Sequence, residues 1–168
     1  MSSDTIAAVA TPPGTGGIAI VRVSGPRAEV ILKALFRRAD RKTAWETHVM
    51  AYGRLVHEGE VLDEAMGVLL RAPRSFTRED VAELHCHGGP VVIARVLEAV
   101  LSCGARAAEP GEFSRRAFEA GRIDLAQAEA TMELIGASGT QAARAAMRQL
   151  GGGLSRYVRA VQKELVDL

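Results

Sequence analysis

The hydrophobic pattern of the 168 residues changes once, close to Pro110. Before this point, short runs rich in β-branched residues, which are typical of strands, are interspersed with apolar residues that recur every three or four positions, as on one face of a helix. After it, only the helical period continues. This order of strands and helices predicts an α+β domain whose helices pack on a sheet, followed by helical structure.

Turn signals separate the strands and helices of the first part. Residues 11–17 hold two prolines and three glycines, which favour a tight turn between two strands. Pro26 stands where the first turn of a helix tolerates proline, and Gly104 stands where a helix commonly ends. We therefore expect strands at 5–10, 18–24, 48–57, 64–71 and 81–87, helices at about 28–36 and 92–103, and a loop at 37–43.

The second part is expected to be helical throughout. Asp124, followed by Gln127 three residues later, has the spacing of a capping box and predicts the start of a helix. Further helices are predicted at 113–120 and 140–150.

An apolar stripe with helical spacing runs to the last residue of the sequence. Because nothing later in the sequence covers it, we expect a missing partner helix and a helical domain that is truncated here. The alternative is a terminal helix that packs back on the domain or on another subunit. The stripe consists of Leu154, Val158, Val161, Leu165 and Leu168.

The charge balance excludes a strong electrostatic field over the whole chain. The sequence has 21 basic and 20 acidic residues, so overall charge does not draw it to nucleic acid or to an anionic membrane. The basic residues look scattered along the chain, which argues against a dedicated RNA-binding patch. Any RNA contact should then be local or shared with other parts.

The cysteines and the N-terminus indicate the compartment. Cys86 and Cys103 are too few and too far apart for a disulfide framework, so both are expected to be reduced. The first residues lack the basic and apolar segments of a secretory signal, and no apolar stretch is long enough to span a membrane. We expect a soluble cytoplasmic protein without membrane contact.

Two charged residues interrupt predicted strands. Arg22 follows the apolar run 18–21, and Glu83 lies inside the run 81–84. One interpretation is that both face solvent, as alternation in a half-covered sheet allows. The other is that they line a polar pocket, because a carboxylate and a guanidinium together suit a pterin or purine. The pattern alone leaves both open.

Other candidate motifs give no catalytic or metal site. Residues 14–17 are rich in glycine but lack the spacing of a phosphate-binding loop. His85 and His87 share a strand face, yet two histidines without a further ligand cluster make a metal site improbable. No nucleophile and base stand in a recognisable arrangement, so we expect no catalytic residue and no metal ligand in this chain.

Three long motifs carry a resemblance to a known family. They are DTIAAVATPPGTGGIAIVRVSG, SFTREDVAELHCHGGP and PGEFSRRAFEAGRIDLAQAEA, and in this order they resemble the start of the tRNA-modification GTPases of the MnmE (TrmE) family. The resemblance implies that residues 1–118 form the N-terminal folate-binding and dimerisation domain, with a mixed β-sheet similar to tetrahydrofolate-binding domains of one-carbon enzymes. Residues 119–168 would begin the helical domain, truncated before the G domain.

The family's GTPase motifs do not occur in the sequence. We find no phosphate-binding loop, no DxxG switch and no NKxD motif. The resemblance therefore places GTP, potassium and magnesium in a G domain outside this chain, together with the family's C-terminal cysteine motif. The chain alone is expected not to hydrolyse GTP.

The resemblance also assigns a binding site. Arg22 and Glu83 match family positions that hold 5-formyl- or methylene-tetrahydrofolate, and Arg122 stands where the family usually has lysine. This lysine-to-arginine change keeps the charge but alters the hydrogen-bond geometry, which makes Arg122 the weakest of the three assignments.

The implied function is a part in modifying a tRNA base. The family adds a carboxymethylaminomethyl or aminomethyl group to the wobble uridine of tRNAs, as a homodimer and together with an FAD-containing partner of the MnmG or GidA type. One alternative is a structural dimerisation module that does not bind folate. Another is a stand-alone folate-dependent transferase, which the missing catalytic groups disfavour.

Overall fold

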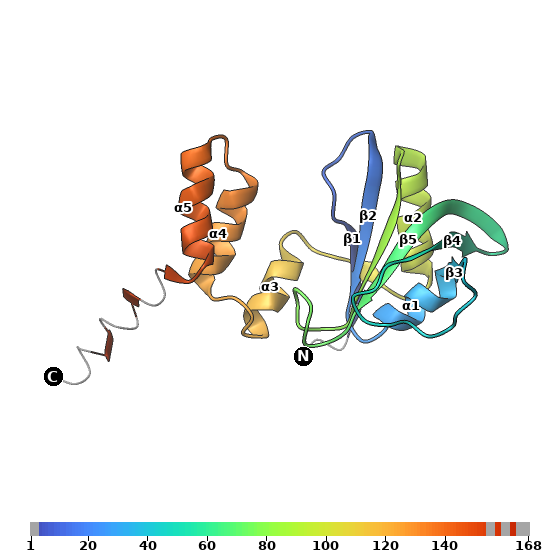
Figure 1. The fold of residues 1–168 in the computed structure, drawn as a ribbon, viewed down its shortest axis with the longest axis horizontal. Helices are drawn as coiled ribbons and strands as arrows, with labels where there is room; N and C mark the ends of the chain where they lie inside the picture. Colours follow the sequence, from blue (N-terminus) through green and yellow to red (C-terminus); the bar gives the residue numbers. More distant parts are fainter. Residues whose placement is uncertain (1–3, 154–156, 159–161, 164–168) are drawn as a thin grey trace. The chain divides into compact units, whose positions relative to one another are not determined.

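The computed structural model describes residues 4–153, 157–158 and 162–163 (Figure 1). The chain divides into two compact units, Met1–Phe113 and Ser114–Leu168. We call them the sheet unit and the helical unit. The predicted domain boundary at residue 118 stays a prediction, and most of the apolar stripe that begins at Leu154 lies outside the described residues.

The sheet unit is built on a seven-stranded sheet in the order β3-β4-β5-β6-β2-β1-β7. Neighbouring strands are antiparallel except β1 and β7, which are parallel. The predicted α+β class with a mixed sheet is therefore confirmed. The elements are β1 Ile6–Val9, β2 Gly16–Ser24, α1 Ala28–Leu35, β3 Phe36–Arg38, β4 Ala51–His57, β5 Glu60–Leu70, β6 Val81–Gly88, α2 Pro90–Ser102 and β7 Arg106–Ala107, and α3 Glu112–Glu119 follows.

Two of these strands were not predicted from the sequence. β3 occupies the start of the predicted loop 37–43, and β7 falls where no strand was predicted. Both are edge strands of two or three residues, β3 paired with β4 and β7 with β1. Their hydrogen-bond partners lie far away in sequence, so pairing rather than local residue pattern determines them.

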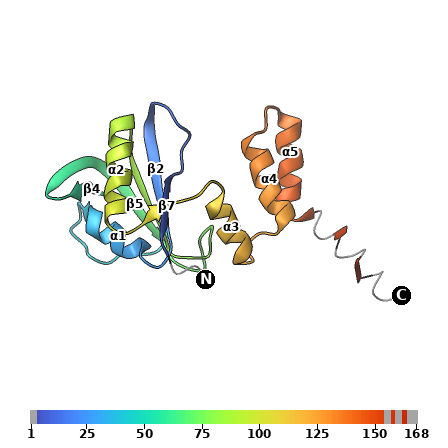
Figure 2. The ribbon, with the colours of Figure 1, turned by 180° about the vertical axis from the view of Figure 1, so that it is seen from behind.

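One face of the sheet carries the core. Val21 and Leu84 project from β2 and β6, and they belong to the same buried cluster as Ile31 of α1 and Val96 of α2. These four side chains are completely buried. Burial of such a side chain stabilises the fold by about 1.5–3 kcal/mol. Both helices therefore cover the same face, as the reverse view shows (Figure 2).

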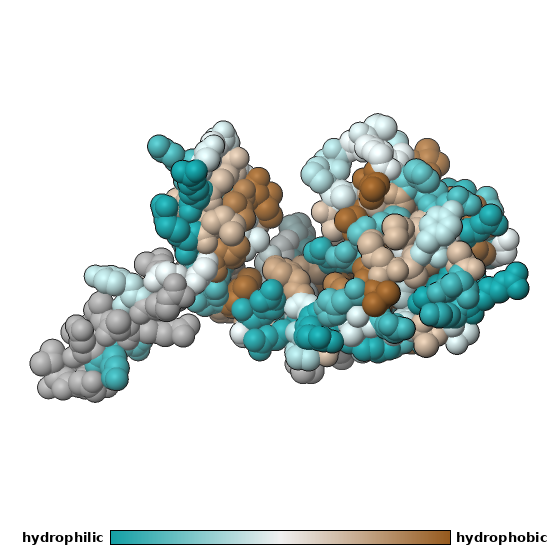
Figure 3. Space-filling view, in the orientation of Figure 1, coloured by the Kyte–Doolittle hydropathy of each residue, from teal (hydrophilic) through white to brown (hydrophobic). Residues whose placement is uncertain are grey.

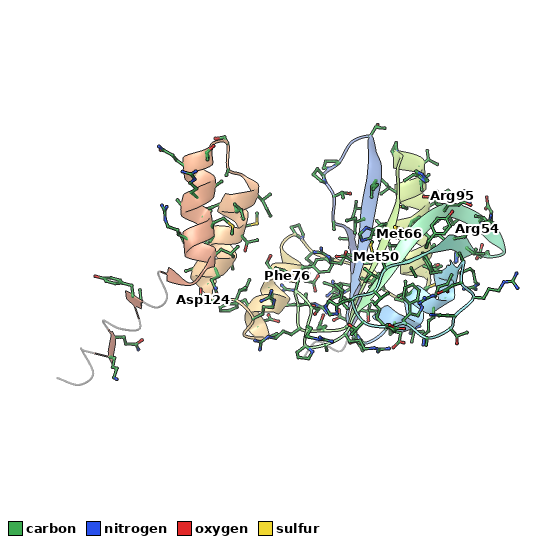
Figure 4. The ribbon with its side chains drawn as sticks, viewed as in Figure 1. Met50, Arg54, Met66, Phe76, Arg95 and Asp124 are labelled. Atoms are coloured by element: carbon green, nitrogen blue, oxygen red, sulfur yellow. The ribbon has the colours of Figure 1, made fainter. Side chains whose placement is uncertain are left out.

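The alternate strand residues point to the opposite face, which neither α1 nor α2 covers. A cross-strand row on this face runs from Ile20 through His85 and Met66 to Tyr52. Tyr52 is 55% exposed and Met66 39% exposed. Apolar side chains are visible at the surface of this unit (Figure 3), and Figure 4 labels two exposed methionines of the unit, Met50 and Met66.

The helical unit contains two packed helices, α4 Leu125–Ile135 and α5 Thr140–Leu150. The predicted capping box is confirmed, because the Asp124 side chain accepts a hydrogen bond from the Gln127 backbone and the Gln127 side chain accepts one from the Asp124 backbone. Asp124 stands at the start of α4 in Figure 4. In the described part of the chain, no helix is long and apolar enough to cross a membrane.

Candidate functional site

Arg22 and Glu83 are direct neighbours across two antiparallel strands. The register of β2 and β6 places them opposite one another on the sheet face that the helices leave uncovered. Arg22 Nη2 lies 2.8 Å from Glu83 Oε1, and Arg22 Nε donates to the same oxygen at 2.8 Å. The two site residues predicted from separate strand runs therefore form one ion pair.

His85 extends this pair along β6. It lies two residues after Glu83, so alternation places both side chains on one face. His85 Nε2 is 3.1 Å from Glu83 Oε2, and because a carboxylate only accepts, that nitrogen carries the proton. Both oxygens of Glu83 thus have a donor. From the sequence, His85 was weighed only as a metal ligand and not as a member of this site. Its position two residues after Glu83 was the signal that could have assigned it to the same strand face.

The group is only partly shielded from solvent. The side chains of Arg22, Glu83 and His85 are 31%, 14% and 21% exposed. The Arg22 guanidinium also lies 5.9 Å from the centre of the Phe113 ring, a cation–π distance that helps hold it in place. The site therefore presents a partly exposed carboxylate acceptor and a cationic donor that are paired with one another.

A buried hydroxyl pair fixes the end of β2 beside this site. Ser24 lies two residues after Arg22, and its hydroxyl donates to Glu79 Oε2 at 2.6 Å. Because that donation uses the single Ser24 proton, the Thr77 hydroxyl, 2.7 Å away, donates to Ser24. Ser24 and Thr77 are almost completely buried. The segment around Thr77 is thereby fastened over the end of the uncovered face.

Arg122 lies in the other unit. It is exposed in the segment between α3 and α4, and its backbone N–H donates to the Ala117 carbonyl at 2.9 Å. The structure describes each unit by itself, so a joint action of Arg122 with Arg22 and Glu83 stays a prediction.

The neighbouring groups on β6 have ordinary structural roles. His87 Nδ1 contacts Asp63 at 2.7 Å, and this carboxylate raises the pKa of His87. Burial raises the pKa of the Cys86 thiol to about 11, so this thiol stays protonated near neutral pH. Among the described residues, no group of three or more His, Cys, Asp or Glu side chains could hold a metal ion.

Comparison with known proteins identifies the family. Residues 5–122 match the family model described as GTP-binding protein TrmE N-terminus. A protein of Heliobacterium modesticaldum named tRNA modification GTPase MnmE is 55% identical to this chain. The match covers 100% of this chain and 37% of the relative. A protein of the same name in Listeria innocua is 50% identical over 99% of this chain and 36% of its own length. The chain thus spans little more than a third of these relatives, and it belongs to the TrmE N-terminal family.

Proposed function

We propose that this chain is the folate-binding and dimerisation part of a cytoplasmic GTPase that modifies the wobble uridine of tRNAs. The proposal extends to it the activity named for its relatives, tRNA modification by a GTPase. The modification would be carboxymethylaminomethyl or aminomethyl, made together with an FAD-containing partner of the MnmG or GidA type. GTP, potassium and magnesium would act in a G domain, since the 168 residues carry no GTPase motif.

The observation that carries folate binding is the Arg22–Glu83–His85 group on the uncovered sheet face. A pterin ring presents an N–H beside an amino group, and a carboxylate such as that of Glu83 can accept from both. Arg22 can hold a carbonyl or carboxylate of the ligand. In this proposal the ligand is 5-formyl- or methylene-tetrahydrofolate, and Arg122 contributes a third positive group.

Entry of the pterin requires a rearrangement within this group. Arg22 and His85 now donate to the two oxygens of Glu83, so at least one donor must give up its place. The exchange conserves hydrogen bonds, because the ligand replaces the donor that leaves. The ion pair therefore serves as a resting state that keeps Glu83 hydrogen-bonded until folate arrives.

Dimerisation is supported by the apolar side chains beside the pair. Met66 and Tyr52 are exposed in the row next to Arg22 and Glu83, and an exposed apolar surface rimmed by polar groups is typical of a protein interface. We propose that a second copy covers this face. The folate site and the dimer contact would then be continuous.

Isothermal titration of the 168-residue chain with 5-formyltetrahydrofolate tests folate binding. Glu83→Gln and Arg22→Gln should each weaken binding by roughly tenfold or more, because a hydrogen bond to a charged group contributes about 1.5–3 kcal/mol. His87→Gln is the matched control, since His87 follows on the same strand but contacts Asp63 instead. It should bind folate as the parent does.

Sedimentation velocity on the same samples tests dimerisation. Met66→Glu should shift the chain toward monomer, whereas Val91→Glu, at a 71% exposed position on α2, should not. A folded dimer without folate binding would leave a structural dimerisation module as the function. A parent chain that is monomeric but binds folate through Glu83 would contradict the proposed dimerisation instead.

A further inference from the structure

Five basic side chains surround a hollow in the sheet unit, away from the folate site just described. The hollow has a volume of about 480 Å³ and lies where α1 passes into β3 and the following loop. Lys33 comes from the end of α1, Arg37 and Arg38 from β3, and Arg41 and Lys42 from the loop. No acidic residue lines it. The interpretation that basic residues are scattered is therefore wrong for this segment.

Three of the five positive charges are partly compensated. Arg38 forms two hydrogen bonds with Asp40, at 2.7 and 2.9 Å, and holds the pKa of that carboxyl at about 2. Lys33 contacts Glu29 at 2.9 Å, but both oxygens of Glu29 also accept from Arg71. Arg37 donates to the carbonyls of Lys33 and Ala34 at the end of α1. Carbonyl dipoles stabilise its guanidinium without cancelling its charge.

Arg41 and Lys42 supply the least compensated charge. Both are exposed, and among the described residues no ion pair joins either side chain to a carboxylate, although the Lys42 charge helps Arg38 to lower the pKa of Asp40. Arg41 has a φ of 56°, the left-handed region, which turns the chain directly after β3. The Lys42 backbone N–H donates to Asp40 Oδ1 at 3.1 Å and fixes this turn. Two exposed cations that form no ion pair are thus held beside three others by local hydrogen bonds.

The aromatic residues of the hollow are unsuited to reading a base. Trp45 is 6% exposed and Phe36 is 4% exposed, and their rings pack edge to face at 5.4 Å. The Arg38 guanidinium covers the Trp45 ring at 5.0 Å. Base recognition in single-stranded RNA relies on accessible aromatic faces, whereas contact with phosphates needs only positive charge. The hollow therefore favours a ligand that presents phosphate groups in series.

We propose that this basic hollow binds the phosphate backbone of RNA. The choice of RNA as the polyanion rests on the proposed part in tRNA modification, while the preference for phosphate rests on the cations alone. Because the contacts are to the backbone, the surface positions RNA without selecting its sequence. It gives the sheet unit a second role, separate from folate.

The test is fluorescence anisotropy of a labelled tRNA, titrated with the 168-residue chain over a series of salt concentrations. Arg41→Asn with Lys42→Gln removes these two exposed charges, and asparagine tolerates the left-handed backbone at residue 41. Binding should weaken by roughly tenfold or more at about 0.1 M salt, and the slope of log K against log salt should fall by about 1–2. The matched control is Arg144→Gln with Arg148→Gln, an equal charge change on exposed positions of α5, which should bind like the parent.

Several outcomes would overturn the proposal. It fails when the parent does not bind tRNA, or when the two double variants bind with the same affinity and salt slope. Inorganic pyrophosphate that displaces tRNA at stoichiometric concentration would identify a small-anion site instead. If the Arg41→Asn, Lys42→Gln variant loses binding to anionic phosphatidylglycerol vesicles but still binds tRNA like the parent, the hollow is a membrane surface instead. Folate titration of the Arg41→Asn, Lys42→Gln variant should match the parent, so failure of this proposal and failure of the folate proposal remain distinguishable.

Discussion

The two units of this chain bury very different side chains. In the sheet unit, Ile31, Leu69 and Leu84 are completely inaccessible to solvent. In the helical unit, α4 and α5 bury the small side chains Ala130 and Ala146, whereas Met132 and Ile135 of α4 are 63% and 76% exposed. The sheet unit has a large aliphatic core, whereas α4 exposes two of its large apolar side chains and the helical unit buries Ile123 just before that helix.

The difference shows that the units depend on different interactions. Large buried aliphatic groups each contribute about 1.5–3 kcal/mol, and an alanine methyl contributes much less. α4 and α5 have 11 residues each, a length at which isolated helices are marginal in water. Their described contacts include amide-to-carbonyl bonds from Gln127 to Leu150 at 2.8 Å and from Gln149 to Ala126 at 3.3 Å. The helical unit should therefore be the less stable one.

The largest effect that tests this comparison is expected from Leu84→Ala in β6. Removing this completely buried side chain leaves a cavity between the sheet and its helices and should destabilise the sheet unit by about 2–5 kcal/mol. Trp45, the single tryptophan, is buried in the same core and reports urea unfolding by fluorescence. Met132→Ala, the control on α4, should leave the Trp45 transition in place. If Leu84→Ala and Met132→Ala shift the Trp45 transition equally, the proposed difference between the two units is wrong.

A smaller effect is expected from Asp124→Ala at the start of α4. The change removes one half of the capping box and should destabilise this helix by about 1 kcal/mol. Amide hydrogen exchange should be faster in α4 and α5 than in the parent chain, and the Trp45 transition should not move. A Trp45 transition that shifts as much as helix exchange would show that both units unfold together.

The same contrast explains what the sequence could predict. The capping box of Asp124 and Gln127 was predicted correctly because both partners lie within one helical turn. The core strands and α1, α2 and α5 were also predicted, since each carries its own apolar period. β3 and β7 were missed because their strand conformation depends on distant neighbours.

For the candidate site, the residues were predictable and their arrangement was not. Arg22 and Glu83 each attract attention as a charge in an apolar run, but 61 residues separate them and only the strand register makes them partners. His85 joins them by alternation within β6, two residues after Glu83, and this spacing was readable in the sequence. The five cations of the basic hollow lie within residues 33–42, so this local cluster was visible in the sequence, and only its place around a hollow needed the fold.

The smallest expected effect concerns acid and the ion pairs of the sheet unit. Hydrogen bonds from Arg71 and Lys33 lower the pKa of Glu29 from 4.5 to about 2. Because the folded pKa is depressed, Glu29 stabilises the fold above about pH 4.5, and the contribution is lost as the pH falls toward 2.

At neutral pH, Glu29→Gln should cost no more than about 1 kcal/mol, since solvent screens this partly exposed group. In urea unfolding followed by Trp45, the gap between parent and variant should narrow steadily below pH 4.5. Glu129→Gln makes the same chemical change at an exposed position of α4 and should leave the Trp45 transition unchanged at every pH. A gap for Glu29→Gln that stays constant down to about pH 3 would show that packing of the side chain, rather than its charge, holds α1 to Arg71.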